Sequence, residues 1–170
     1  MFEELRQRIL VDRESLESQR LLMPAVVDAD AKRQALLGEL GPLLERIGIE
    51  LQPLGPSAIG VQAFPSLLFD RGVDPVGFTN ELLDKVEAGE IKPTAPGDTD
   101  VGVPEAALHE VLDMMSCKAA VKAGDRLSDD ELAALLAKRD QIERSESCPH
   151  GRPTTVRLTL KDLEKHFHRS

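Results

Sequence analysis

Aromatic side chains and cysteine are scarce in this sequence. It has no tryptophan, no tyrosine and only five phenylalanines, so we do not expect the aromatic platform on which proteins stack the bases of single-stranded nucleic acid. Its two cysteines, Cys117 and Cys148, are too few for a disulfide framework, which favours a reducing, cytoplasmic location. No apolar run approaches the roughly 20 residues that a helix needs to cross a bilayer, and the first residues lack the apolar stretch of a secretory signal. We therefore expect no membrane contact.

Positive charge is also in short supply. The chain has 21 Lys and Arg residues against 30 Asp and Glu residues, which gives a net charge of −9. Binding to nucleic acid is driven mainly by lysine and arginine side chains that neutralise phosphates and release counterions. A chain this acidic repels DNA on average, so we expect any contact with DNA to be weak, and to be local, bridged by a metal or assisted by a tether.

The remaining composition is that of a folded protein. Hydrophobic residues make up 41% and charged residues 30% of the chain, which indicates a globular rather than a disordered protein. A length of 170 residues suffices for one domain with a real core or for two small lobes.

Hydrophobic periodicity and turn residues predict the elements of the chain. In the first half they are a helix from Phe2 to about Gln19, an extended segment at 21–30, a helix at 31–48 that Gly41 and Pro42 should kink or split, a hairpin from Ile49 to Ala63 and a helix at 73–89. In the second half they are a linker at 90–105, a helix at 105–124, a helix that begins with a capping box of Ser128 and Glu131, a short strand at 154–160 and a helix at 161–168.

The composition changes near Val101, where a segment rich in Pro, Gly, Asp and Thr gives way to mostly apolar helices. We therefore predict an α+β fold in two lobes: an external α/β lobe at 21–104, inserted into a second lobe of residues 1–20 and 105–170. The first helix has no residue before Met1 that could cap its amide groups, so we expect the chain to begin inside an element.

The segment CPHGRP places Cys148 and His150 close together on a frame of prolines and glycine. The prolines restrict the backbone and the glycine permits a sharp bend, so the two side chains can point to the same side. Thiolate and imidazole are good zinc ligands, and Cys117 is a third candidate. The structural alternative is a polar turn, with Cys117 in a helical core position, because cysteine is among the most buried residue types. The residues by themselves favour this alternative.

The helix MMSCKAAVKAGDRLSDDELAALL, the segment CPHGRPTTV and the closing FHR together resemble the C-terminal domain of the MutL family of DNA mismatch-repair proteins. The resemblance covers essentially the whole chain, and the SCKxxxK helix and the CPHGRP segment at this separation are its specific parts. It implies that Cys117, Cys148 and His150 hold a regulatory or structural zinc ion beside a nicking centre, with Arg169 near that site. It also implies a homodimer and a bacterial, cytoplasmic and nucleoid-associated location, with a lobe for dimerisation and endonuclease activity and an external regulatory lobe.

The main motif of the family's endonucleases, DQHAxxExxxxE, is represented here only by its last glutamate, Glu3 in MFEEL. The resemblance implies Mn²⁺ or Mg²⁺ as the catalytic ion, and such an ion needs hard oxygen ligands, whereas Cys117, Cys148 and His150 are softer. We interpret the chain as truncated at its N-terminus and expect it to be inactive as a nuclease. Its intact parent is expected to be a latent metal-dependent endonuclease in which Glu3 and Arg169 serve catalysis. ATP would bind only in an N-terminal domain of the family, which nothing in this chain resembles.

The segment QRLLMP resembles the family's sliding-clamp binding motif, Q-x-x-[L/I]-x-P. In such motifs a short extended segment inserts an aliphatic side chain into an apolar pocket, so Leu22 and Pro24 would contact the pocket and Gln19 would hydrogen-bond at its edge. The structural alternative is the end of a helix that a proline stops.

The resemblance also implies the mismatch-recognition protein MutS as a partner. Two rival functions remain: a dimerisation and clamp-interaction module without catalysis, and a generic zinc-stabilised binding domain. Relatives of the family that lack endonuclease motifs tend to lose the CPHGRP residues as well, so their presence here favours the endonuclease hypothesis for the parent.

Overall fold

The chain forms two compact units in the computed structural model, Met1–Val121 and Lys122–Ser170. The structure describes residues 5–12, 14–93, 103–121, 124–139 and 158–167. The first unit mixes helices and strands, and the described part of the second unit is helical, so the chain has the predicted mixture of α and β elements. The boundary between the compact units falls at Val121 rather than near residue 104, because the helix that follows residue 104 shares the core of the first unit. The two predicted lobes stay a prediction.

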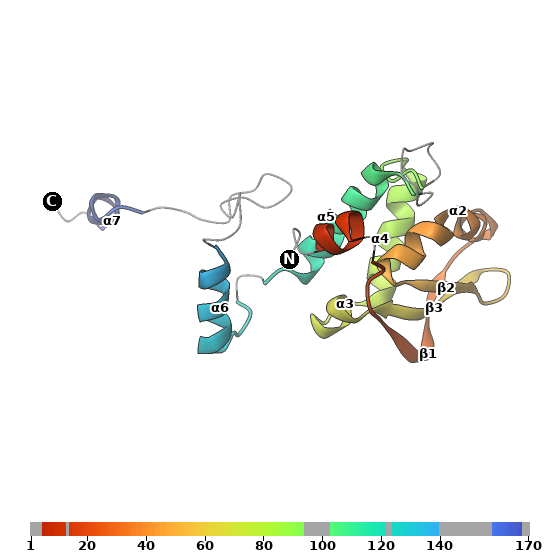
Figure 1. Cartoon of the computed structure of the whole chain (residues 1–170), viewed down its shortest axis with the longest axis horizontal. Coiled ribbons are helices and arrows are strands. Elements are labelled where there is room, and N and C mark those ends of the chain that lie inside the picture. Colours follow the sequence, from red (N-terminus) through yellow and green to blue (C-terminus); the bar gives the residue numbers. More distant parts are fainter. Residues whose placement is uncertain (1–4, 13, 94–102, 122–123, 140–157, 168–170) are drawn as a thin grey trace. The chain divides into compact units, whose positions relative to one another are not determined.

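A three-stranded antiparallel sheet forms part of the first unit, with its strands in the order β1-β3-β2 (Figure 1). The strands β1 (Ser18–Asp28) and β2 (Glu50–Pro53) each pair with β3 (Ala58–Pro65). The hairpin of β2 and β3 confirms the prediction for that segment, and β1 contains most of the predicted extended segment. One side of the sheet faces the core, because Val27 and Ile59, which lie opposite each other in the ladder, are fully buried.

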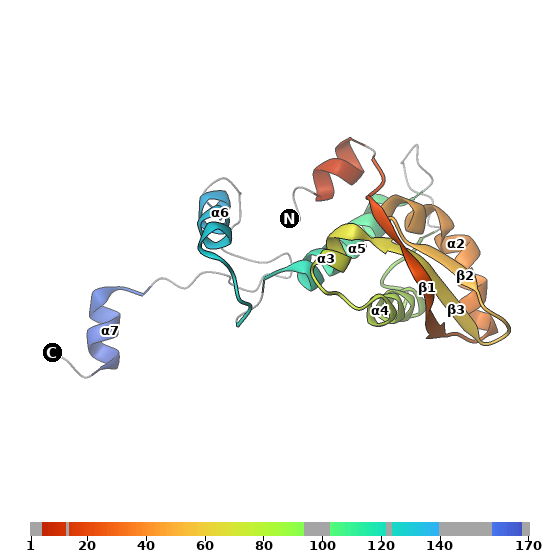
Figure 2. The same cartoon turned by 90° about the horizontal axis from the view of Figure 1, so that it is seen from below.

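Besides the first helix, the described part of the first unit contains the helices α2 (Ala31–Ile47), α3 (Ser66–Asp70), α4 (Pro75–Glu87) and α5 (Glu105–Ala119) (Figure 2). Helix α2 contacts β2 and β3, α4 contacts β1 and β3, and α3 contacts α5. Phe64 of β3 and Phe78 of α4 meet edge to face, with 5.6 Å between their ring centroids. Buried side chains of α5, such as Leu112, belong to the same hydrophobic core. The helix predicted at 105–124 ends at Ala119, since Ala120 takes an extended conformation.

The first helix is shorter than the sequence predicts. Its described part runs from Leu5 into a π-helical turn, η1 (Gln7–Val11), and ends there. The prediction that it reaches about Gln19 is wrong, because the chain from Ser18 onward pairs with β3 instead. Apolar side chains at helical spacing do not show where a helix gives way to a strand, since that depends on a partner strand far along the chain.

Helix α2 runs unbroken through Pro42, so the helix is not split at Gly41 and Pro42, whereas the alternative of a kink there stays a prediction. A proline inside a helix leaves the carbonyl group four residues earlier without its usual partner, and here that residue is Gly38. Both Gly38 and Pro42 are exposed, so water can solvate this carbonyl group. The helix ends at Gly48, whose φ of 73° and whose approach to Leu16 leave no room for a side chain: a Cβ atom would lie 2.7 Å from the carbonyl oxygen of Leu16.

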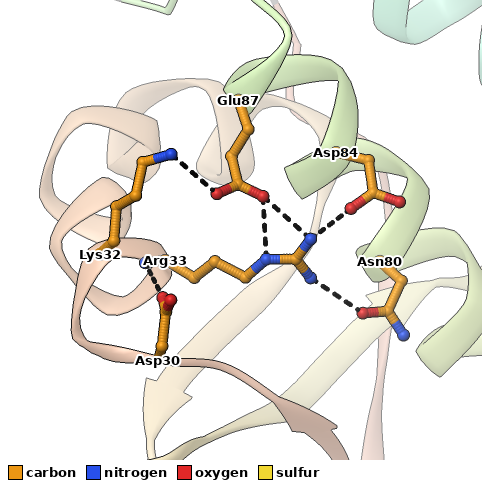
Figure 3. A network of polar contacts seen from close by, with 6 residues as sticks. All are labelled: Asp30, Lys32, Arg33, Asn80, Asp84 and Glu87. Atoms are coloured by element: carbon orange, nitrogen blue, oxygen red, sulfur yellow. Dashed lines mark hydrogen bonds and ion pairs between the residues drawn. The ribbon is translucent and has the colours of Figure 1, made fainter.

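Polar contacts centred on Arg33 join the start of α2 to α4 (Figure 3). Its Nε atom donates to Oε2 of Glu87 at 2.9 Å and one terminal nitrogen donates to Oδ1 of Asn80 at 3.3 Å, while the other terminal nitrogen pairs with Asp84. The backbone N–H of Arg33 donates to Oδ1 of Asp30, the N-cap of α2, at 2.9 Å. One arginine therefore fixes the orientation of two helices that both pack on the sheet.

The second unit contains the helices α6 (Asp129–Arg139) and α7 (Leu160–His166) in its described part. The predicted capping box is confirmed: the Glu131 carboxylate accepts from both the backbone N–H and the hydroxyl of Ser128, each at 2.9 Å. A second capping box, of Thr159 and Asp162, starts α7. The described end of the predicted strand at 154–160 is not a strand, because Thr159 is already committed to capping this helix. Residues 154–157 lie outside the described residues.

Candidate functional site on an edge strand

The strand β1 lies at one edge of the sheet, and its pairing with β3 is interrupted. Pairing runs up to Arg20, which lies opposite Ala63, and resumes at Ala25, which lies opposite Val61. Residues 21–24 have no pairing of their own in this ladder and form a bulge, which we call the β1 bulge. A bulge at a sheet edge turns side chains away from the regular alternation of the strand, so it can present them to a partner.

The three residues predicted to bind a clamp all lie on β1. Gln19 is exposed just before the bulge, Leu22 lies within it, and Pro24 closes it in a half-buried position. The side chain of Leu22 is 104% exposed and that of its neighbour Met23 is 81% exposed. The structural alternative for this segment, a helix end followed by a proline stop, is wrong because Gln19 lies in a strand.

An ion pair across the sheet fixes the start of the bulge. Arg20 of β1 and Glu50 of β2 both lie opposite Ala63 of β3, one on each side. A terminal nitrogen of Arg20 and Oε1 of Glu50 are 3.2 Å apart, so their side chains meet over the small alanine. Both side chains are largely exposed, so the pair contributes at most about 1 kcal/mol. It orients the last paired residue before the bulge.

Exposed apolar residues near the bulge were not found from the sequence. Val26 and Leu54 are 56% and 38% exposed, respectively. Leu54 belongs to the turn after β2, and only the pairing of both β1 and β2 with β3 brings it near the bulge. No signal within a single segment could have indicated it.

The predicted metal ligands are only partly described. Cys117 lies on α5 in a half-buried position, and its neighbour Lys118 pairs with Glu81 of α4, with 2.6 Å between Nζ and Oε2. Four other predicted site residues lie outside the described residues: Glu3, Cys148, His150 and Arg169. Among the residues that the structure does describe, no group of three or more His, Cys, Asp or Glu side chains could hold a metal ion. By its chemistry, a donor set of two thiols and one imidazole fits zinc.

Helix α6 exposes a row of leucines in the second unit. Leu132, Leu135 and Leu136 are 44%, 50% and 59% exposed, respectively. Their spacing places them on one face of the helix. Helix α7 shows the same pattern, with Leu160 and Leu163 both exposed. Contiguous exposed apolar surface of this kind marks interaction sites between proteins.

None of the helices in the described ranges is long and apolar enough to cross a membrane.

An α+β unit with an apolar bulge at its sheet edge, and a helical unit with an exposed leucine face, are typical of the class of domains that bind other proteins. Comparison with known proteins gives the family. Residues 1–127 match the family model of the MutL C terminal dimerisation domain, and the chain belongs to that family.

Curated relatives over the same region are DNA mismatch repair proteins named MutL. The protein of Rhizobium rhizogenes is 35% identical over 170 residues, which is all of this chain and 26% of that protein. The proteins of Syntrophobacter fumaroxidans and of Neisseria meningitidis serogroup C are 34% and 36% identical, each over 152 residues, which is 89% of this chain and 21% of each relative. The chain thus spans about a quarter of the length of the relatives that it matches.

Proposed function

We propose that this chain serves in DNA mismatch repair as a homodimerisation domain that docks on a sliding clamp, as part of a latent metal-dependent endonuclease. The family's description as a dimerisation domain and the names of the relatives support the repair role and the dimer. The observation that best supports the proposed clamp interaction is the full exposure of Leu22, which lies in the motif Q-x-x-L-x-P on the β1 bulge.

The geometry of the bulge suits insertion into an apolar pocket. Leu22 and Met23 are 104% and 81% exposed, so little of their surface is covered before binding, and Gln19 is exposed at the start of the same segment. Burying one exposed leucine is worth about 1.5–3 kcal/mol. Because β1 already holds the segment in an extended form, few additional rotatable bonds lose their freedom on binding, which reduces the entropic cost of binding.

Clamp docking also compensates for the weak affinity of this negatively charged chain for DNA. A net charge of −9 gives poor affinity for phosphates, whereas a partner that encircles DNA holds the bound domain close to the strand. Such a tether raises the effective concentration of the domain at DNA, to about the millimolar range for short linkages. We infer that docking, rather than direct affinity, brings the domain to its substrate.

The clamp interaction is tested by titrating the chain with a purified bacterial sliding clamp. The double variant Gln19→Ala, Leu22→Ala should raise the dissociation constant at least about tenfold, since a central anchor is lost. Val11→Ala is the matched control, because Val11 is an exposed apolar residue of η1 outside β1. Equal binding by the double variant and the wild type would reject the clamp interaction.

The metal part of the proposal rests on the donor set. Cys117, Cys148 and His150 would hold zinc, and Glu3 and Arg169 would lie near a catalytic Mn²⁺ or Mg²⁺ ion. Such an ion, when bound, polarises a phosphodiester and activates water. The role of the chain's own residues would be to hold the ions and, for Arg169, to face a phosphate. MutS and DNA are proposed partners of the longer protein, and DNA contact stays weak without a tether.

A further inference from the structure

Gly60 of β3 lies beneath two side chains from different parts of the chain. A Cβ atom at this position would lie 2.6 Å from Cδ1 of Leu54, 2.9 Å from its Cγ atom and 3.1 Å from Cβ of Pro24. Real Cβ atoms essentially never approach other heavy atoms below 3.0 Å, so a larger residue at this position would force the side chain of Leu54 to shift. A glycine within a strand often marks such a close approach.

The two side chains over Gly60 therefore lie next to each other. Pro24 ends the β1 bulge, and Leu54 follows β2. Val26, which lies opposite Gly60 in the ladder, is 56% exposed. Leu54, Pro24 and Val26 together extend the apolar surface of the β1 bulge across the outer side of the sheet.

The turn that carries Leu54 is held firmly. The backbone N–H of Leu54 donates to the carbonyl oxygen of Ala58 at 2.8 Å. The side-chain amide of Gln34, on α2, donates to the carbonyl oxygen of Gly55 at 3.1 Å. Leu54 is therefore presented at a fixed place, although it is distant in sequence from the bulge.

We propose that Leu54 is a second contact of the clamp-binding surface, and that Gly60 is a positioning residue that seats Pro24 and Leu54 side by side. This inference rests on the proposed clamp interaction and names two further residues of the same site. The occupant is the same partner, because the surface of Leu54 is continuous with Pro24 of the motif. If Leu54 contributes in this way, recognition of the chain by the clamp depends on the folded sheet and not only on the linear motif.

The physical reason is preorganisation. A linear segment in solution loses side-chain and backbone freedom when it binds, at about 0.5–1.5 kcal/mol for each immobilised side chain. Here Pro24 is held against β3 before any partner arrives, and Leu54 adds apolar area that a peptide of residues 17–27 lacks. We therefore expect the folded chain to bind the clamp more tightly than that peptide.

The experiment measures the dissociation constant between the full chain and a purified bacterial sliding clamp, together with the melting temperature of each variant. Leu54→Ala removes a side chain that is 38% exposed, so it should lower the melting temperature modestly and, at a temperature where the variant is folded, weaken binding about fivefold or more. Gly60→Ala should weaken binding at least as much, because its Cβ atom displaces Leu54 and presses on Pro24. Gly38→Ala is the matched control, since a Cβ atom there has nothing within 4 Å.

A double variant separates positioning from general damage. If Gly60→Ala acts by displacing Leu54, adding Leu54→Ala should weaken binding less than the two single effects combined. Wild-type affinity for Leu54→Ala, combined with loss of binding by Leu22→Ala, would overturn this inference and leave the clamp interaction intact. Absence of binding by the wild-type chain would instead overturn the clamp interaction itself, and this inference with it. Equal affinity of the peptide of residues 17–27 and the folded chain would also overturn it.

Discussion

Among single residues, Arg33 joins two helices through several polar contacts. Its guanidinium group contacts Asn80, Asp84 and Glu87 on α4. Burial lowers the pKa of Arg33, but the hydrogen bonds with Asp84 and Glu87 and their charges raise it more, so the net shift is upward. The guanidinium therefore stays charged around neutral pH, and the contact between α2 and α4 does not depend on its titration there.

Replacing Arg33 tests these contacts between α2 and α4. Arg33→Ala should lower the free energy of unfolding by about 1–2 kcal/mol, because the Glu87 side chain is only 22% exposed and loses charged hydrogen bonds, whereas the Asp84 side chain is 63% exposed. Urea denaturation of the full chain measures the change. Arg20→Ala is the control: its pair with Glu50 is exposed, so the loss should stay within about 0.5 kcal/mol. Equal losses for the two variants would contradict the role of Arg33.

The sequence predicts some residues of the candidate site and not others. Gln19, Leu22 and Pro24 follow one another along the chain, so a motif with fixed spacing indicates them. Leu54 and Gly60 join the surface only because two strands pair with β3. Contacts between segments that are distant along the chain leave no local pattern, and they were therefore not predicted.

At the level of helices and strands, local chemistry predicts the elements better than their ends. The hairpin of β2 and β3 and the start of α6 follow from turn residues and a capping box, which act within a few positions. The end of the first helix and the continuity of α2 through Pro42 depend on strand pairing and on solvent exposure. Both are properties of the folded unit, which explains why the predicted end of the first helix is wrong and why α2 is not split at Pro42.

The start of α7 should depend on pH. The Thr159 hydroxyl and then the Thr159 backbone N–H donate to Asp162, which lowers the pKa of this carboxyl below its ordinary value of 3.8. A lowered pKa in the folded state means that the stabilisation is present above the unfolded pKa and is lost as the pH falls through the folded pKa. We expect α7 to keep its N-terminus above about pH 4 and to fray at lower pH.

The amide chemical shift of Thr159, followed by NMR between neutral pH and acid, measures this loss. Asp162→Asn is the control, because it keeps the shape of the side chain and removes the titration. A midpoint at or above 3.8, the ordinary pKa of the carboxyl, would contradict the expected direction.

On the scale of the whole molecule, the exposed leucines of α6 suit a second copy of the chain. Replacing Leu135 and Leu136 by Asp should shift the molar mass measured by light scattering from dimer towards monomer, because charges in an apolar interface are costly to bury. Ala134→Asp adds one such charge on the opposite face of the same helix and should leave the mass unchanged. A dimer that survives the double variant would place the interface elsewhere.

Nicking tests the expectation that this chain is inactive as a nuclease. We expect no robust nicking of supercoiled DNA by the 170-residue chain in the presence of Mn²⁺. Glu3 is the only residue of the motif DQHAxxExxxxE in this chain, and the proposed zinc ligands are soft. Agarose electrophoresis with and without a chelator measures this, and a plasmid cut by a nicking enzyme serves as the reference. Robust, chelator-sensitive nicking would show that the residues present suffice for catalysis.

The β1 bulge also has a consequence for solubility. An exposed edge strand with regular, unpaired N–H and C=O groups can pair with the edge of another molecule, which leads to aggregation. The bulge interrupts that row at residues 21–24, and Pro24 has no N–H to donate. The feature that presents Leu22 therefore also limits strand-to-strand association. A domain that lost the bulge but kept its apolar side chains would lose its partner and become prone to form sheets with itself.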